Sequence, residues 1–73
     1  MNFTERLKIL RADHDLTQDK VAREMDMPLR SYTRLETDGA KPNYDTLMKI
    51  ADFYDISVDW LMGRTDRREV NRS

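Results

Sequence analysis

Two arginines one helical turn apart, with a threonine between them, lie in the segment 28–37 near the middle of the chain. On a helix drawn at about 100° per residue, the outward side of this segment carries Leu29, Arg30, Thr33, Arg34 and Thr37. The opposite side is mostly apolar, as is typical of a packed face, and holds Pro28, Ser31, Tyr32 and Leu35. Arginine can donate two hydrogen bonds to guanine O6 and N7, and threonine can contact a thymine methyl group or a phosphate. The pattern predicts a face that contacts DNA, and its alternative is a solvated face with ordinary surface arginines.

A second short amphipathic helix is predicted just before this segment, from four side chains that share one face: Gln18, Val21, Ala22 and Met25. Ala22 is small enough to let another helix approach closely. Asp26 tolerates a left-handed backbone better than most residues, and Pro28 has a fixed φ suited to a first helical turn. Two short helices joined by a tight turn can offer one face to a DNA groove while they bury the other.

Three further helices must position this pair. The first runs from about Phe3 to Asp13, the second follows Asn43, and the last covers Val58 to Met62 before Gly63. The second has the strongest apolar stripe of the chain, which consists of Leu47, Ile50, Ala51 and Tyr54. The candidate N-cap residues are Asn2 or Thr4, Thr17, Asn43 and Ser57. We therefore expect an all-α, compact five-helix domain.

The composition weighs against several classes of protein. A chain of 73 residues without cysteine forms one domain with a small core and no cysteine-based metal site. It has neither an apolar run of membrane-spanning length nor a secretory apolar core near its N-terminus, so a cytoplasmic protein is expected. His14 is the only histidine, and no glycine-rich phosphate loop or catalytic ordering is evident. We expect no metal, no cofactor and no enzymatic activity.

The charge balance gives a mixed indication. A net charge of −1 and an isoelectric point of about 5.7 weigh mildly against nucleic-acid binding, because such domains are usually strongly basic. The local charge of a surface matters more than the total, however. Several acidic residues of the C-terminal half lie away from the predicted DNA face, among them Asp45, Asp52, Asp55 and Asp59.

Most of the chain resembles the helix-turn-helix DNA-binding domain of phage lambda-repressor and Cro-type regulators. The residues that carry the resemblance are Gln18, Val21, Ala22, Met25, Met27, Tyr32, Leu35, Glu36, Gly39, Lys41, Pro42 and the run LMKIADFYDISVDWLMGRTD. On this basis residues 1–66 form the DNA-binding domain and 67–73 a polar tail. From Arg64 onward the chain has almost no apolar content and is expected to fray.

The resemblance implies roles for particular residues. The base-reading residues would be Leu29, Arg30, Thr33 and Arg34. Phosphate contacts would come from Gln18 and Lys41, to which we add Arg11 and Arg23. Arg11 and Glu36 match a salt bridge that ties the first helix to the end of the third. In resembling proteins the last helix often forms a two-fold dimer contact, here Trp60, Leu61 and Met62, and the alternative is that Trp60 covers the domain's own core.

Three positions depart from the family pattern. Asp26 replaces the usual turn glycine, at a small cost in stability. Pro28 replaces a capping serine or threonine and supplies neither a side-chain cap nor an amide donor. Leu29 replaces a commonly polar base-reading residue, which indicates either contact with a thymine methyl group or a changed specificity.

These observations predict a sequence-specific regulator of transcription that binds double-stranded DNA as a homodimer on an inverted repeat, most simply a repressor of prophage or mobile-element type. With no second domain to sense a ligand, regulation would act through concentration, dimerisation, proteolysis, or an antagonist or toxin protein. An antitoxin or a restriction–modification controller would use the same DNA face. A protein-interaction module that has lost DNA binding is the alternative from another class, favoured by the negative net charge, Pro28 and Leu29.

Overall fold

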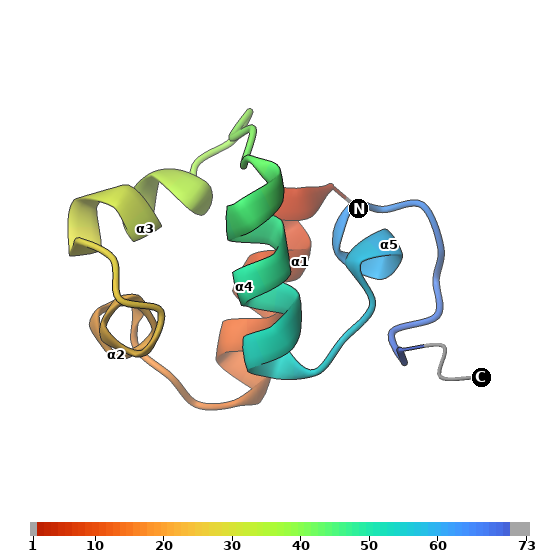
Figure 1. Cartoon of the computed structure of the whole chain (residues 1–73), viewed down its shortest axis with the longest axis horizontal. Helices are drawn as coiled ribbons and strands as arrows, with labels where there is room; N and C mark the ends of the chain where they lie inside the picture. The colour runs from red at the N-terminus through yellow and green to blue at the C-terminus, as the bar shows by residue number, and fades with distance from the viewer. Residues whose placement is uncertain (1, 71–73) are drawn as a thin grey trace.

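The computed structural model describes residues 2–70, which form five α-helices (Figure 1). In chain order they are α1 (Phe3–Asp13), α2 (Gln18–Glu24), α3 (Leu29–Leu35), α4 (Tyr44–Tyr54) and α5 (Val58–Leu61). The expected all-α, five-helix fold is confirmed. Among the described helices none is long and apolar enough to cross a membrane.

The third helix is shorter than the predicted segment 28–37. Pro28 is its N-cap, with the extended torsion angles φ −62° and ψ 145°, and therefore lies outside the helix rather than in its first turn. Its carbonyl oxygen still accepts hydrogen bonds from the amides of Ser31 and Tyr32, at 3.0 and 3.1 Å. Because Pro28 precedes the helix, its side chain is exposed, and its predicted place on the packed face is wrong.

Four of the five described helices begin with a side-chain cap. The oxygen of each capping side chain accepts a hydrogen bond from the amide three residues further on, and the caps are Asn2, Thr17, Asn43 and Ser57. The donor–acceptor distances lie between 2.8 and 3.2 Å. These caps satisfy amides that a helix leaves without an internal partner. Only α3 begins without one.

The same four helices end in a common motif. A residue with positive φ stops the helix, and these residues are Asp15, Asp26, Asp55 and Gly63. The amide that follows each of them donates to the carbonyl five residues back, as in Met27 to Ala22 at 3.0 Å. After the three aspartates this amide belongs to an apolar residue, Leu16, Met27 or Ile56, and all three pack in or against the core. The left-handed turn predicted at Asp26 is thus confirmed, and it recurs at two further aspartates.

The core lies between α1, α4, α5 and the helix pair α2–α3. Its fully buried members are Leu7, Leu10, Val21, Tyr32, Ile50 and Leu61. The stripe predicted on α4 is entirely buried, from Leu47 to Tyr54. Leu16, in the turn between α1 and α2, is half-buried and packs against the core.

Arg68, in the segment predicted to fray, makes several contacts with the rest of the domain. The carbonyl of Arg68 accepts a hydrogen bond from the amide of Ser57 at 2.9 Å, and its guanidinium pairs with Asp13 at 3.0 Å. Arg68 also lies over the Trp60 ring, 4.6 Å from the ring centroid. Cation–π stacking and backbone hydrogen bonds hold this segment although it has little apolar content. Residues 71–73 of the predicted tail lie outside the described residues.

Candidate nucleic-acid interface

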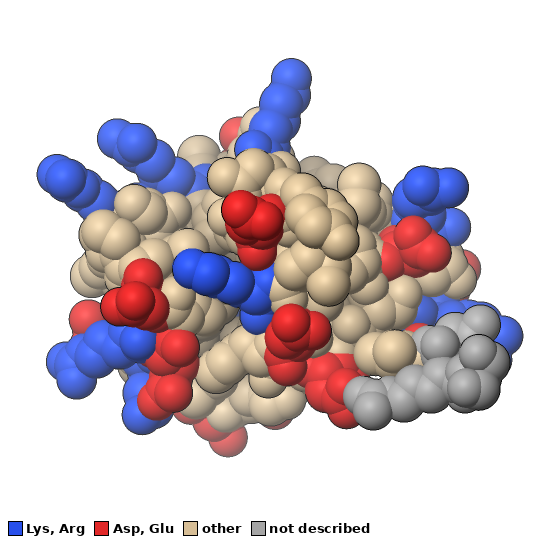
Figure 2. Space-filling model, viewed as in Figure 1, with Lys and Arg blue, Asp and Glu red and all other residues tan. Residues whose placement is uncertain are grey.

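One side of α3 is anchored and the other is open to solvent. Tyr32 is completely buried, whereas all five side chains predicted to face outward are exposed: Leu29, Arg30, Thr33, Arg34 and Thr37. Figure 2 shows Lys and Arg side chains that project outward over α3 and over the loop after it. Neither Arg30 nor Arg34 forms an ion pair with any of residues 2–70. Their guanidinium groups are therefore available to an external acceptor.

Glu36, which follows α3, is the centre of the contacts that anchor this helix. Its carboxylate accepts two hydrogen bonds from Arg11, from Nε at 2.7 Å and from Nη2 at 3.0 Å. It also accepts one from the hydroxyl of Tyr32 at 2.5 Å and one from Nε2 of Gln18 at 3.1 Å. The salt bridge implied by the resemblance is confirmed, and it connects α1 to the end of α3. The hydrogen bond from Gln18 adds α2 to these contacts.

The network determines the charge state of its members. Burial alone would raise the pKa of the Glu36 carboxyl, but the hydrogen bonds from Arg11, Tyr32 and Gln18 outweigh it and hold that pKa below its ordinary value. Burial, with the hydrogen bond to Glu36, raises the pKa of Tyr32. At neutral pH the group is thus an ionised carboxylate among donors, in a geometry that fixes α3 against α1 and α2.

Gln18 connects this network to the exposed face. Its Nε2 donates to Glu36, and its Oε1 accepts a hydrogen bond from the hydroxyl of Thr33 at 3.1 Å. The side chain at the start of α2 is therefore held directly beside the middle of α3. In this arrangement the hydroxyl proton of Thr33 is engaged, although the residue is exposed.

The residues predicted to contact phosphate lie in different environments. Lys41 is exposed in the loop between α3 and α4. Arg23 is exposed on α2 and pairs with Asp19 at 2.8 Å. Arg11 differs from Lys41 and Arg23 because all three of its guanidinium nitrogens donate within the chain. Its Nε and Nη2 donate to Glu36, and its Nη1 donates to the carbonyl of Leu16 at 3.0 Å. Its geometry supports a positioning role rather than a phosphate contact.

The three residues considered for a dimer contact also differ. Trp60 and Leu61 are buried within the chain, so Trp60 covers the domain's own core, as the alternative held. Arg6 and Arg68 both lie over the indole, 4.7 and 4.6 Å from its centroid. Met62 is 49% exposed. With Phe3, Lys41, Pro42 and Leu47 it lines a hollow of about 250 Å³.

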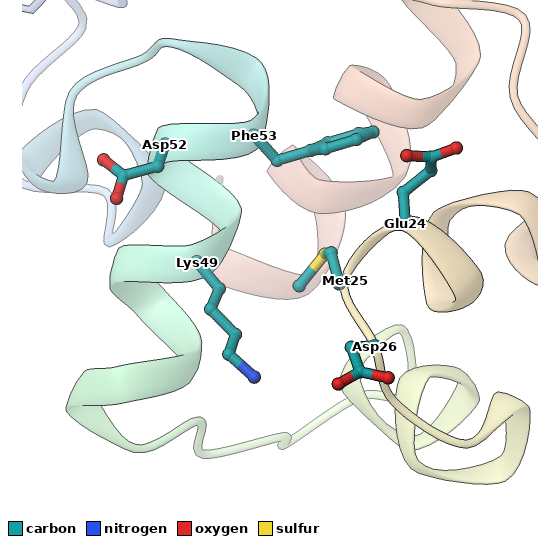
Figure 3. Close-up of a pocket in the computed structure, with 6 residues that line it drawn as sticks. All are labelled: Glu24, Met25, Asp26, Lys49, Asp52 and Phe53. Carbon is teal, nitrogen blue, oxygen red and sulfur yellow. The ribbon is translucent and has the colours of Figure 1, made fainter.

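A second hollow, which sequence reasoning missed, has the opposite charge from α3. It lies between the end of α2 and the middle of α4 (Figure 3), and its lining is Glu24, Met25, Asp26, Lys49, Asp52 and Phe53. Three carboxylates and one ammonium group make this region negative, and Figure 2 shows acidic side chains over α2 and α4. A polyphosphate backbone would be repelled here. The separation of charge over the surface explains how a chain of net charge −1 can still present a cationic face.

The five-helix fold and the exposed face of α3 define a helix-turn-helix DNA-binding domain. A sequence model of the HTH_3 helix-turn-helix family matches residues 7–61. The chain belongs to this family, which is of the lambda-repressor and Cro type, and the resemblance noted from its residues is confirmed.

Individual relatives are similar to this chain over most of its length. It is 38% identical over 64 residues to the uncharacterised HTH-type transcriptional regulator YobD of Bacillus subtilis, which covers 88% of this chain and 57% of that protein. It is 39% identical over 64 residues, with the same coverage, to the cryptic phage CTXphi transcriptional repressor RstR of Vibrio cholerae. To the HTH-type transcriptional regulator ImmR of Bacillus subtilis it is 29% identical over 73 residues, 58% of that protein. The chain thus spans less than three fifths of these relatives.

Proposed function

We propose that this chain regulates transcription by reading the major groove of double-stranded DNA with α3, as a homodimer on an inverted repeat. The observation that carries the proposal is the exposed face of α3. Arg30 and Arg34 form no ion pair with the described residues 2–70, while Tyr32 fixes the helix from its other side. Free guanidinium groups on a rigid helix are suited to bidentate contact with guanine.

The contacts divide into those that specify sequence and those that position the domain. Arg30, Thr33 and Arg34, together with Leu29, face the base edges. Lys41 and Arg23 bind phosphate, and the amide group of Gln18 reaches the backbone at the start of α2. Arg11 acts indirectly through Glu36, which keeps α3 in place.

The homodimer follows from the way in which such a domain reads a site. Two copies related by a two-fold axis would place their α3 helices about one DNA turn apart, roughly 34 Å. Because Trp60 and Leu61 are buried in the single chain, Met62 is the member of the proposed contact that offers substantial surface. The hollow beside it, lined by Phe3 and Pro42, offers further apolar area to a second copy.

Repression is the proposed outcome of binding. Its support is the similarity to RstR, which is named as a transcriptional repressor of a cryptic phage. A regulator that only occupies its operator needs no contact beyond those to DNA and to its own copy.

Selection of bound sequences from a random duplex pool at moderate salt tests the proposal. The wild type is expected to enrich an inverted repeat, whereas the variant with both Arg30→Ala and Arg34→Ala is expected to enrich none. An antitoxin or a restriction–modification controller would also enrich a repeat, and genomic location of that repeat would separate these roles. Absence of enrichment by the wild type would contradict the proposal and favour a protein-interaction module.

The salt dependence of binding to the selected site tests the phosphate contacts. Each neutralised phosphate should contribute about −0.9 to the slope of log K against log salt concentration. Lys41→Ala should make the slope shallower by about 1 per bound copy. The matched control is Arg67→Ala, which removes an exposed positive charge beyond α5 and should leave the slope unchanged.

A further inference from the structure

The beginning of α3 is apolar and exposed, although it lies on the face proposed to read DNA. Leu29 is 45% exposed, and Pro28 before it is also exposed. Together with Arg30 and Thr33 these residues line an open hollow at the surface. No described side chain outside this group of four lines the hollow. The hollow is therefore continuous with the proposed base-reading residues and separate from the core.

The part of this hollow formed by Pro28 and Leu29 offers no side-chain hydrogen-bonding group. Pro28 has neither a backbone N–H nor a polar side chain, and the side chain of Leu29 is a hydrocarbon. A base edge that offers only donors and acceptors would lose water here without a compensating hydrogen bond. The apolar group that the major groove presents is the C5-methyl group of a pyrimidine. An apolar hollow in the reading face therefore matches a methyl group better than any other feature of the groove.

The residues around the hollow predict which base lies next to that methyl group. Arg30 follows Leu29 directly and projects from the same exposed face. Its guanidinium is suited to guanine O6 and N7. Thr33 is exposed and lines the hollow, and its hydroxyl donates to Gln18 at 3.1 Å. The lining of the hollow thus combines apolar groups with a guanine-binding group.

We propose that this hollow binds the C5-methyl group of a pyrimidine next to a guanine bound by Arg30, and that Leu29 determines this specificity. The inference rests on the proposed function, because it requires α3 to enter the major groove. The methyl group has two possible sources in duplex DNA, thymine and 5-methylcytosine. Burial of one such group should be worth about a fourfold change in affinity, from the transfer free energy of a single carbon.

The experiment uses the operator obtained by selection and changes one methyl group at a time. Each thymine of a half-site is replaced in turn by deoxyuridine, which removes the C5-methyl group and keeps every hydrogen-bonding group. The wild type should show one position per half-site at which the affinity falls about fourfold. At that position 5-methylcytosine should bind about fourfold more tightly than cytosine. If the thymine operator binds more tightly than the 5-methylcytosine operator, thymine is the preferred source, and the reverse order identifies 5-methylcytosine.

Two variants assign the effect to the hollow. Leu29→Ala should abolish the difference between thymine and deoxyuridine at that position, and the exposure of Leu29 means that the fold should be retained, as thermal unfolding would verify. Arg34→Ala should weaken binding overall but keep the thymine-to-deoxyuridine ratio of the wild type.

The outcomes that overturn the inference differ from those that overturn the proposed function. If the wild type enriches an operator, but neither deoxyuridine in place of any thymine nor 5-methylcytosine in place of any cytosine changes its affinity, the methyl hollow is wrong and DNA reading by α3 stands. A methyl effect that persists in Leu29→Ala would equally exclude the hollow as its source. If no sequence is enriched at all, the proposed function fails and the inference fails with it.

Discussion

The helix α3 and the four helices around it are held in place in different ways. Within residues 2–70, α1, α2, α4 and α5 each begin with a side-chain cap and end at a residue with positive φ. The helix α3 has neither, because its N-cap Pro28 offers no side-chain acceptor and no residue of positive φ directly follows the helix. It is held instead by Tyr32 and by the carboxylate of Glu36, through contacts to α1 and α2.

This difference separates local from tertiary stabilisation. The residues that flank a capped helix largely determine where it begins and ends. The position of α3 depends on Arg11 and Gln18, which are 25 and 18 residues away from Glu36 in the chain. The helix proposed to enter the groove is thus the one whose orientation the rest of the fold controls most directly.

Removal of the Arg11 side chain should have the largest effect on this arrangement. Arg11→Ala leaves the Glu36 carboxylate buried without its cation and should lower the free energy of unfolding by about 3 kcal/mol. Urea denaturation followed by circular dichroism measures this change. Arg23→Ala, which breaks an exposed pair with Asp19, is the control and should change stability by less than about 0.5 kcal/mol. Equal effects of the two variants would mean that the Glu36 network does not anchor α3.

Acid should weaken the same anchor. Since the pKa of Glu36 in the folded protein lies below its ordinary value of 4.5, its contribution to stability is complete above that value. The contribution is lost as the pH falls through the lower pKa of the folded state. Urea midpoints measured from pH 7 to pH 3 should therefore fall more steeply for the wild type than for Glu36→Gln, which cannot titrate. Parallel curves would contradict this account of Glu36.

Loss of one local cap should cost less than loss of the network. Thr17→Ala removes the hydrogen bond from the amide of Lys20 and should lower the free energy of unfolding by about 1 kcal/mol. Thr17→Ser keeps the hydroxyl and should retain most of that energy. If Thr17→Ala cost as much as Arg11→Ala, the contrast between local caps and tertiary anchoring would be lost.

The smallest expected effect concerns the turn between α2 and α3. Asp26 has a φ of 54°, a conformation that glycine adopts at lower cost. Asp26→Gly should raise the free energy of unfolding by about 0.5 kcal/mol. Asp19→Gly, within α2, should instead lower it by up to about 1 kcal/mol. Thermal unfolding of both variants would show whether their effects have opposite signs.

The sequence predicted those parts of the fold that depend on neighbouring residues. The caps at Thr17, Asn43 and Ser57 and the buried stripe of α4 were all found from local spacing. The turns at Asp15 and Asp55 were missed, although a signal was present. In each case an aspartate that is followed by an apolar residue ends a helical stripe, as at Asp26.

Contacts between distant segments could not be predicted in this way. Arg6 is buried, and its Nη1 donates to the carbonyls of Trp60 and Thr65, at 2.6 and 2.8 Å. The charge of an arginine suggests exposure, although position 6 shares a helical face with Phe3, Leu7 and Leu10. Its two carbonyl partners lie 54 and 59 residues further along the chain, so nothing nearby in the sequence identifies them. Arg68 over Trp60 is a contact of the same kind. For the candidate site, spacing was enough to identify the exposed face of α3, whereas the hydrogen bond between Gln18 and Thr33 required the packing of α2 on α3.

The central claim is that Arg30 and Arg34 contribute to recognition and not to the fold, whereas Arg11 contributes to the fold. The most direct test compares the affinities of the variant with both Arg30→Ala and Arg34→Ala for the selected operator and for a random duplex, together with its thermal unfolding. We predict that the ratio of the two affinities falls by about tenfold or more, at roughly 1–3 kcal/mol per contact, while the unfolding temperature stays that of the wild type. An unchanged ratio, or a loss of stability like that expected for Arg11→Ala, would contradict the account.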